Sequence, residues 1–370
     1  MFLSNPDNQS EKARSTGNES SKLKGIQAVQ RQVMEALMRP EAYDEDPGQI
    51  ELIQTHISIV FLTRNYVYKV KKAVDFGFLD FTTLEKRRLF CRKELELNRR
   101  LCGDMYVGVV PINRSDIIKI EGEGETVEYA VKMKRMPQER MMNSLLEKDN
   151  IDSELIDRIA KIISDFHSKA NTNRRISEFG SLPTIRINWK ENFEQTQEFV
   201  GETISLKDLE LIRERVGTFM KRNVLFFEKR VAESRVRDCH GDIHTGNIFV
   251  TECIYIFDAI EFNERFRYSD IASDIAFLAM DLDFKKRSDL SDFFVKRYVN
   301  YSGDYELVKL LPFYKCYRAY VRGKVTSFKL NDPNLGGKEK ETAIREAKAY
   351  FKLASTYAKS LAGAFAFNSY

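Results

Sequence analysis

Apolar positions along the chain recur with different periods, and the change of period predicts two regions of different structure. Near the start, Ile26, Val29, Val33 and Leu37 recur at the spacing of one helical face, which predicts a first helix. Residues 1–25 before this helix are mostly polar and cannot bury enough surface to offset the entropy of ordering them. We therefore expect residues 1–25 to form a disordered tail.

The region after the first helix is rich in β-branched and aromatic residues. Residues 56–62 and 66–72 are two such runs, and the short segment Thr-Arg-Asn separates them, which predicts a β-hairpin. A helix is expected from Thr83, a suitable N-cap, to Leu101. Three more β-strands are expected at residues 105–112, 117–120 and 127–136.

The rest of the chain carries mostly helical periodicity. Residues 151–167 form an amphipathic pattern, and a longer helical pattern covers residues 209–231. Two short apolar strands, 247–250 and 254–257, interrupt this region. The patterns predict an α+β fold with two lobes.

The expected lobes are a small β-rich N-terminal lobe over residues 26–136 and a larger helical C-terminal lobe over residues 137–370. The larger lobe would contain both of the short strands. A hinge would lie where the last β-strand of the small lobe ends.

Composition excludes several classes of protein. The 370 residues include 59 Lys and Arg against 55 Asp and Glu, and this small excess gives no reason to expect a nucleic-acid partner. No stretch approaches the ~18–20 apolar residues of a membrane span, and the first residues do not resemble a secretory signal. The five cysteines are scattered and form no CxxC pair, so we expect free thiols in a cytoplasmic protein.

The segment that carries candidate chemistry is CHGDIHTGNIFV, residues 239–250, followed by IYIFDAIEF, residues 254–262. Asp242 and Asn247 lie five residues apart on an expected loop, and the two short strands return Asp258 to that loop. Carboxylate and amide oxygens gathered in this way suit Mg²⁺, while one carboxylate can stay off the metal and accept a proton from a hydroxyl. This arrangement is typical of phosphoryl transfer.

These two segments resemble the catalytic signature of the aminoglycoside phosphotransferase and choline kinase-like enzymes, which have a protein kinase-like fold. YVYKVKKAVDFGFLDFTTLEKR and FDAIEFNERFRYSDIASDIAFLAMDLD are most similar to bacterial and archaeal members whose substrate is undefined. The resemblance covers roughly residues 50–330. It implies an ATP- and Mg²⁺-dependent kinase that acts on a hydroxyl of a small molecule.

The resemblance also implies roles for individual residues. Asp242 would be the catalytic base, and Asn247 and Asp258 would hold Mg²⁺. His240 would brace the loop. Asp270 would begin the next helix and steady the loop through hydrogen bonds.

The nucleotide side is expected to need a strand lysine that contacts the phosphates and pairs with a helix glutamate. Lys69 and Lys71 share one face of their strand, and we favour Lys69 because it is more central in the strand. Glu94 lies on an apolar helical stripe, where a carboxylate needs a buried partner, whereas Glu96 lies on the polar side. We therefore expect a Lys69–Glu94 pair.

The hinge between the expected lobes would lie at Met133–Met136. The backbone of Met133 and Met136 would hydrogen-bond the adenine of ATP.

Alternatives to a small-molecule kinase are also considered. The first hairpin lacks the glycine-rich phosphate lid of protein kinases, which would suit a nucleotide-binding regulatory module without catalysis. A protein kinase role is disfavoured because Gly241 stands where those enzymes carry a regulatory arginine.

Zinc binding by His240 and His244 is disfavoured because Gly241 and Gly246 break the helix that would align them. His167, on an apolar stripe, is interpreted as a core histidine.

The charge of the acceptor stays open at this point. Residues 255–283 are rich in acids, including Glu261, and such density suits a cationic or polyhydroxyl acceptor. Arg265 and Arg267 in the same segment would suit an anionic one. Glu261, Arg265 and Arg267 are therefore candidate substrate residues for a small-molecule acceptor, and the oligomeric state does not follow from the sequence.

Overall fold

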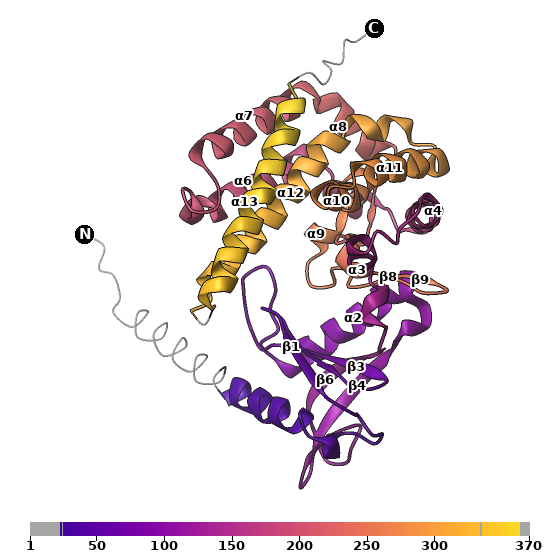
Figure 1. Ribbon diagram of the computed structural model, residues 1–370, viewed down its shortest axis with the longest axis vertical. Coiled ribbons are helices and arrows are strands. Elements are labelled where there is room, and N and C mark those ends of the chain that lie inside the picture. The colour runs from indigo at the N-terminus through magenta and orange to yellow at the C-terminus, as the bar shows by residue number, and fades with distance from the viewer. Residues whose placement is uncertain (1–22, 24, 334, 363–370) are drawn as a thin grey trace, which may run out of the picture. The chain divides into compact units, whose positions relative to one another are not determined.

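A computed structural model describes residue 23, residues 25–333 and residues 335–362 (Figure 1). The described chain forms two compact units. Unit 1 comprises the described residues up to Pro137 together with Glu261–Asn263, and unit 2 comprises Gln138–Ile260 and the described residues from Glu264 onward. The short segment 261–263 therefore packs with a part of the chain that is distant from it in the sequence, which the sequence did not indicate.

Unit 1 is built on one antiparallel sheet with the strand order β1-β2-β3-β6-β4-β5. Its strands are β1 (Glu51–Gln54), β2 (Ser58–Leu62), β3 (Tyr66–Lys71), β4 (Tyr106–Arg114), β5 (Ile118–Ile120) and β6 (Glu125–Lys134). The predicted hairpin is present as β2 and β3, and Leu62 pairs with Val67 next to its turn. β1 was not predicted, because it is four residues long and three of them are exposed.

One helix, α2 (Leu84–Cys102), packs on this sheet. Its N-cap is Thr83, whose side chain accepts a hydrogen bond from the Lys86 N–H, as the sequence predicts. Gly103 ends the helix with a positive φ of 47°, a conformation that glycine adopts without strain. The helix thereby presents Glu94 to the sheet at a fully buried position.

A further helix over residues 25–37 packs on the same unit, and its Val33 and Leu37 are part of the hydrophobic core. Its Gln30 amide donates to the Lys71 carbonyl and to Glu128, both at 2.7 Å. The predicted disordered tail lies almost wholly outside the described residues. The helix is therefore fixed by a buried polar contact as well as by apolar packing.

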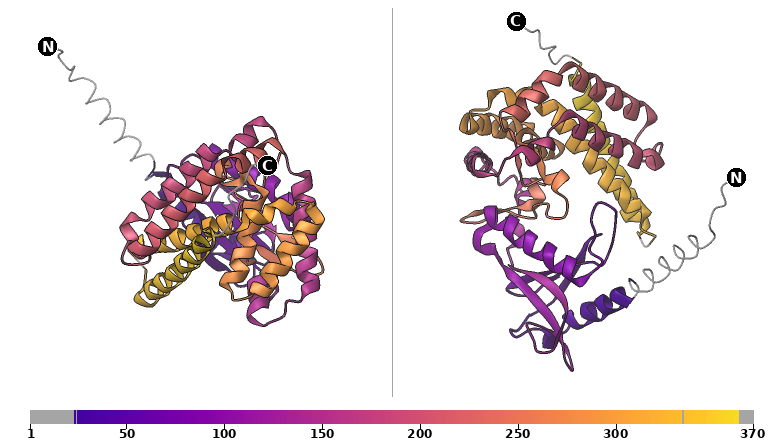
Figure 2. Two further views of the ribbon diagram at one scale, coloured as in Figure 1. Left: turned by 90° about the horizontal axis from the view of Figure 1, so that it is seen from above. Right: turned by 180° about the vertical axis from the view of Figure 1, so that it is seen from behind.

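Unit 2 is mostly helical (Figures 1 and 2). Its helices are α3 (Met142–Glu147), α4 (Ser153–Lys169), α5 (Arg174–Glu178), α6 (Leu182–Gln195), α7 (Leu206–Arg222), α8 (Val224–Ala232), α9 (Glu264–Arg267), α10 (Ile271–Phe284), α11 (Ser288–Ser302), α12 (Leu311–Phe328) and α13 (Gly337–Ser360). Its strands are β7 (Val236–Asp238), β8 (Ile248–Val250), β9 (Ile254–Ile256) and β10 (Tyr268–Asp270). The predicted pair of short strands is present as β8 and β9.

The centre of unit 2 is α10, in which every residue from 271 to 282 is buried. A helix that is buried on all sides belongs to the core, and α11 and α12 pack against it. The long helices α12 and α13 lie side by side, as orange and yellow ribbons in Figure 1. None of the described helices combines the length and apolar character needed to cross a membrane.

The helical pattern predicted over residues 209–231 is present as two helices. α7 ends at Arg222 and α8 begins at Val224, and Asn223 between them leaves the helical conformation. The Asn223 side chain donates to the Phe219 carbonyl at 2.8 Å, which satisfies a carbonyl at the end of α7. Apolar periodicity continues across the break, so it did not reveal the break.

A buried ion pair gives a first test of the unit 1 packing. Arg87 of α2 donates from Nε to both oxygens of Glu128 at 2.8 and 2.9 Å, and both side chains are nearly inaccessible to solvent. Glu128→Ala leaves the buried Arg87 charge without its carboxylate partner, so we expect a loss of about 3–5 kcal/mol in the free energy of unfolding.

Urea unfolding followed by circular dichroism measures this loss. Glu125→Ala, on the same strand but exposed, is the matched control and should change stability by less than about 0.5 kcal/mol. Equal effects of the two substitutions would contradict a structural role for the Arg87–Glu128 pair.

Candidate active site

The loop between β7 and β8 brings two of the predicted site residues together. The Asn247 amide nitrogen donates to the Asp242 carboxylate and to the Asp242 carbonyl, both at 3.0 Å. The Phe257 N–H donates to the Asn247 carbonyl at 3.0 Å, so the residue just before Asp258 is fixed to the same loop. The loop and the β8–β9 hairpin thus gather Asp242, Asn247 and Asp258 within one short stretch of unit 2.

Gly241 in this loop cannot be replaced without distortion. Its φ is +89°, and a Cβ placed there would lie 3.0 Å from the Phe266 carbonyl oxygen and 3.2 Å from Ile260. Both the backbone conformation and the space therefore require glycine. A larger residue at position 241 would therefore be strained and tightly packed.

The loop is held by a buried carboxylate, Asp274 of α10. It accepts hydrogen bonds from the backbone N–H of His240 at 3.0 Å and of Gly241 at 2.8 Å. The prediction that Asp270 steadies the loop is wrong. Asp270 does begin α10, but its carboxylate binds Arg230 and the Ala272 N–H, and it lies one helical turn before the residue that reaches the loop.

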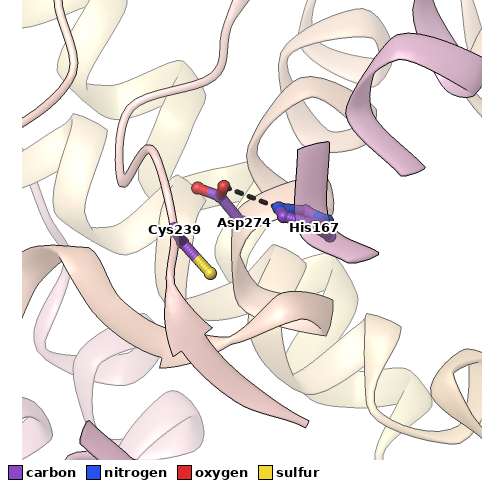
Figure 3. A group of neighbouring side chains, drawn as sticks. All are labelled: His167, Cys239 and Asp274. Atoms are coloured by element: carbon purple, nitrogen blue, oxygen red, sulfur yellow. Dashed lines mark hydrogen bonds and ion pairs between the residues drawn. The ribbon is translucent and has the colours of Figure 1, made fainter. Parts of the chain in front are cut away.

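Asp274 has a third partner, which Figure 3 shows. His167 of α4 lies with Nε2 3.0 Å from the Asp274 carboxylate, and its Nδ1 lies 2.7 Å from the Tyr298 hydroxyl. Burial alone would raise the pKa of Asp274, but His167 and His240 outweigh it and hold this pKa far below its usual range. His167 is a buried core histidine, as predicted, and it also supports the residue that holds the loop.

His167, Asp274 and Cys239 are close enough together to suggest a metal site. Both nitrogens of His167 are already used, and the Cys239 thiol donates to the Ser269 carbonyl. Burial raises the pKa of Cys239 well above its usual value, which disfavours the thiolate that a metal would need. We interpret this group as a hydrogen-bond network.

Two more side chains bind the loop, one at Thr245 and one at the carbonyl of Gly241. Asp281, seven residues after Asp274 on α10, accepts from the Thr245 N–H at 2.9 Å and from the Thr245 hydroxyl at 2.6 Å. Arg318 of α12 donates to the Gly241 carbonyl at 2.9 Å and to the Ser273 carbonyl at 3.0 Å. Side chains from α10 and α12 therefore determine the conformation of the loop.

The histidines of the loop contact its own backbone. His240 is buried and its Nδ1 lies 3.3 Å from the Asp242 N–H. His244 accepts from the Gly246 N–H at 3.1 Å, and its Nε2 lies 3.6 Å from the Asp242 carboxylate. Burial alone would raise the pKa of Asp242, but His244, Arg322 and His240 together lower it to about 2. Asp242 is therefore ionised at neutral pH.

Unit 1 carries the predicted lysine–glutamate pair with an extra lysine. Glu94 binds Lys69 at 2.9 Å and Lys71 at 2.8 Å, so the two lysines are not distinguished by distance. Their environments differ, since the Lys69 side chain is 15% exposed and that of Lys71 is 1% exposed. Burial would raise the pKa of Glu94, but the two lysines outweigh it and lower it to about 2.

Glu261 is the second partner of Lys71, to which it makes a very short contact. It is buried and packs in unit 1. The substrate role predicted for Glu261 stays a prediction, and the structure adds that its carboxylate pairs with the Lys71 ammonium group. The two residues are 190 positions apart in the sequence, and no local pattern indicates the contact.

Arg265 and Arg267, the other two predicted substrate residues, are also engaged inside the protein. Arg265 binds both oxygens of Glu191, at 2.8 and 2.5 Å. Arg267 is buried and donates to Asp238 at 2.6 Å and to the Ile260 carbonyl at 2.9 Å. Both guanidinium groups therefore have partners inside the protein, and their predicted substrate role stays a prediction.

The predicted hinge is partly inside a strand. Met133 belongs to β6 and is paired with Val67 on one side and Tyr106 on the other. Met136 lies beyond the end of β6, next to Pro137, where unit 1 ends. Met133 is therefore a residue of the sheet, and Met136 alone lies in the connection between the units.

Comparisons with known proteins bear on the fold. No family model matches the chain. Uncharacterized proteins from Mycobacterium bovis and from two strains of Mycobacterium tuberculosis are 32% identical to it over 281 residues, which is 76% of this chain and 55% of theirs. The chain thus spans about half the length of the curated relatives it matches.

Among solved structures, a choline/ethanolamine kinase family protein from Mesorhizobium loti aligns with a TM-score of 0.51 and 11% identity. The alignment covers 89% of this chain and 99% of that protein. The chain has a protein kinase-like fold. The predicted fold class is thereby confirmed. An ethanolamine kinase from Plasmodium vivax aligns over 82% of this chain with a TM-score of 0.46 and 14% identity, and adds nothing to this conclusion.

Sequence reasoning missed Asp274, Asp281 and Arg318, although part of the signal was present. Two aspartates seven residues apart in a mostly apolar helix, at positions that are both buried, must each have a partner. That rule indicates a structural role for both carboxylates. It does not name the loop as the partner, and Arg318 carries no local signal.

The hydrogen bonds of Asp274 predict a local effect of substitution. In Asp274→Asn, one carboxylate oxygen becomes an amide donor, which cannot accept from the backbone N–H groups that Asp274 binds. We expect the amide protons of His240 and Gly241 to exchange with solvent about tenfold faster or more. Hydrogen exchange followed by mass spectrometry or NMR measures this.

Asp270→Asn is the control, since it also removes a buried carboxylate at the start of α10. It should destabilise unit 2 through Arg230 without selectively exposing the His240 and Gly241 amides. If the His240 and Gly241 amides exchange faster in Asp270→Asn and not in Asp274→Asn, then Asp270 and not Asp274 steadies the loop.

Proposed function

We propose that the chain is an ATP- and Mg²⁺-dependent phosphotransferase that transfers the γ-phosphoryl group to a hydroxyl of a small molecule. The observation that carries this proposal is the contact of Asn247 with Asp242. The Asn247 amide nitrogen donates to the carboxylate of Asp242, the proposed base. The amide oxygen of Asn247 is then the atom that would bind the metal. One loop thus supplies an ionised carboxylate and a hard oxygen ligand side by side.

Residues of unit 2 would act on the acceptor and the metal. The Asp242 carboxylate would accept the proton of the acceptor hydroxyl as that oxygen attacks phosphorus. The Asn247 amide oxygen and the Asp258 carboxylate would hold Mg²⁺, which prefers such hard oxygen ligands. Mg²⁺, when bound, supplies neutralisation of the charge that develops on the transferred phosphoryl group.

Residues of unit 1 would bind the phosphates of ATP. Lys71 is fully buried between two carboxylates, whereas Lys69 is partly exposed. Lys69 is therefore better suited to reach a phosphate, and Glu94 would hold it in place. Lys71 would anchor Glu94 and Glu261 in the interior of unit 1.

The first test of this proposal is catalytic. Purified protein with ATP and Mg²⁺ should phosphorylate at least one compound in a library of hydroxylated metabolites, measured as ADP release. Asp242→Asn should lower this turnover about a thousandfold or more, because the proton acceptor is lost.

The matched control is Asp157→Asn, which removes a surface carboxylate that pairs with Arg297 on α11; it should keep turnover within about twofold. Turnover that survives in Asp242→Asn would contradict the assignment of the base. Tight ATP binding with no turnover on any compound would favour the regulatory module instead.

The second test separates the two lysines. Lys69→Met should weaken ATP binding about tenfold or more with little change in melting temperature, because a partly exposed charge is removed. Lys71→Met leaves Glu94 and Glu261 close together in the interior, so it should lower stability by about 3 kcal/mol or more. Calorimetric titration with ATP and thermal unfolding measure the two effects. The reverse pattern would assign the phosphate contact to Lys71.

A further inference from the structure

The acidic residues that suggested a cationic acceptor are committed to partners inside the protein. Besides Asp258, which is assigned to the metal, the acids of residues 255–283 pair as follows: Glu261 with Lys71, Glu264 with Arg175, Asp270 with Arg230, Asp274 with the loop backbone and His167, Asp281 with Thr245, and Asp283 with Lys315. Their negative charge is therefore balanced or used structurally. This segment gives no acidic surface for an ammonium-bearing acceptor.

Arg322 of α12 differs from the other basic groups of unit 2 considered so far. The Nε atom of Arg322 is buried and has no hydrogen-bond partner among the described residues, while the rest of the guanidinium contacts Tyr350. Arg265 and Arg267, by contrast, each bind a carboxylate. Arg322 forms no ion pair with any carboxylate in the described part of the chain.

The helix places Arg322 next to the catalytic base. Arg318, four residues earlier and so on the same face of α12, donates to the carbonyl of Gly241, the residue before Asp242. Arg322 lies one turn further along and is close enough to Asp242 to contribute to the low pKa of that carboxyl. A positive charge thus lies beside the base without being paired to it.

The guanidinium of Arg322 also packs against an aromatic ring. It lies over the ring of Tyr350 on α13, 5.5 Å from the ring centroid. Tyr350 is buried and stacks on Phe284 of α10 with ring centroids 3.7 Å apart. An arginine held on a packed aromatic platform loses little further entropy when it binds a ligand.

We propose that Arg322 binds an anionic group, a carboxylate or a phosphate, on the acceptor. The acceptor of this phosphotransferase is then a hydroxylated anion, and its charged group lies at Arg322 while its hydroxyl lies at Asp242. The planar guanidinium matches both oxyanions through paired N–H groups. This inference rests on the proposed function and specifies the substrate class of the same site.

The experiment uses the full chain with ATP, Mg²⁺ and a library in which hydroxylated compounds are grouped as anionic, neutral and cationic. Gluconate, glucose 6-phosphate, glucose and glucosamine represent these groups. We expect the best substrate to be anionic, with kcat/KM at least about tenfold above neutral or amine-bearing analogues of similar size. A best substrate that is neutral or cationic overturns the inference and leaves the proposed function standing. No turnover in any group overturns both.

Variants of Arg322 test the contact itself. With the best anionic substrate, Arg322→Gln should raise the acceptor KM about tenfold or more and leave the KM for ATP within about twofold. Arg322→Lys keeps the positive charge and should raise the acceptor KM less than Arg322→Gln does. An equal rise in KM in both variants would assign the effect to a folding defect. Lys324→Gln on the same helix, where Lys324 binds Asn192 and Gln195, is the matched control and should leave the acceptor KM unchanged.

The split between kcat and KM decides the role of Arg322. If Arg322→Gln lowers kcat equally for anionic and neutral acceptors and leaves both KM values unchanged, Arg322 acts on Asp242 alone. That result overturns the inference. A gain in the relative kcat/KM for glucosamine in Arg322→Glu would support it directly, because the charge at the site is then reversed.

Discussion

The buried carboxylate of Asp274 is the constraint on which the candidate active site depends. An ionised group in the interior needs several hydrogen-bond donors, and Asp274 obtains them from His167 and from the backbone of His240 and Gly241. Because α10 is buried on all sides, this carboxylate cannot shift to follow a mobile loop. The loop instead adopts the conformation that the helix requires, and Gly241 permits it.

Buried charge also constrains unit 1, where the partners of the buried carboxylates are lysine side chains and not backbone N–H groups. Lys69, Lys71, Glu94 and Glu261 carry two positive and two negative charges in a nearly inaccessible cluster. Removing Lys71, Glu94 or Glu261, the three most deeply buried members, leaves a buried charge without compensation, which is far more costly than loss of a surface ion pair. The cluster therefore fixes the side chains that we propose to act on ATP.

Local patterns in the sequence predict the sheet except for β1, and they predict α2 and the β8–β9 hairpin, because alternation and N-capping are local effects. The apolar stripe of α2 also indicates that Glu94 is buried with a basic partner. Strand alternation places Lys69 and Lys71 on one face but does not rank them. The two lysines are distinguished by their burial and by the contact of Lys71 with Glu261. Both differences depend on tertiary packing.

Other features of the site are not available from local patterns. Asp270 and Asp274 are one helical turn apart, and only the packing of α10 decides which of them reaches the loop. Glu261 contacts a lysine 190 residues away, and Arg322 is one of four basic residues on α12. Its position beside Asp242 appears only when α10, α12 and α13 are assembled.

The central claim is that the loop and hairpin of unit 2 hold a divalent metal for phosphoryl transfer. Mn²⁺ can replace Mg²⁺ at oxygen ligands and is observable by electron paramagnetic resonance. Titration of Mn²⁺ into the full chain with a non-hydrolysable ATP analogue should show tight binding that weakens about tenfold or more in Asp258→Asn and in Asn247→Leu. Equal Mn²⁺ affinity in the wild type and both variants would contradict the claim.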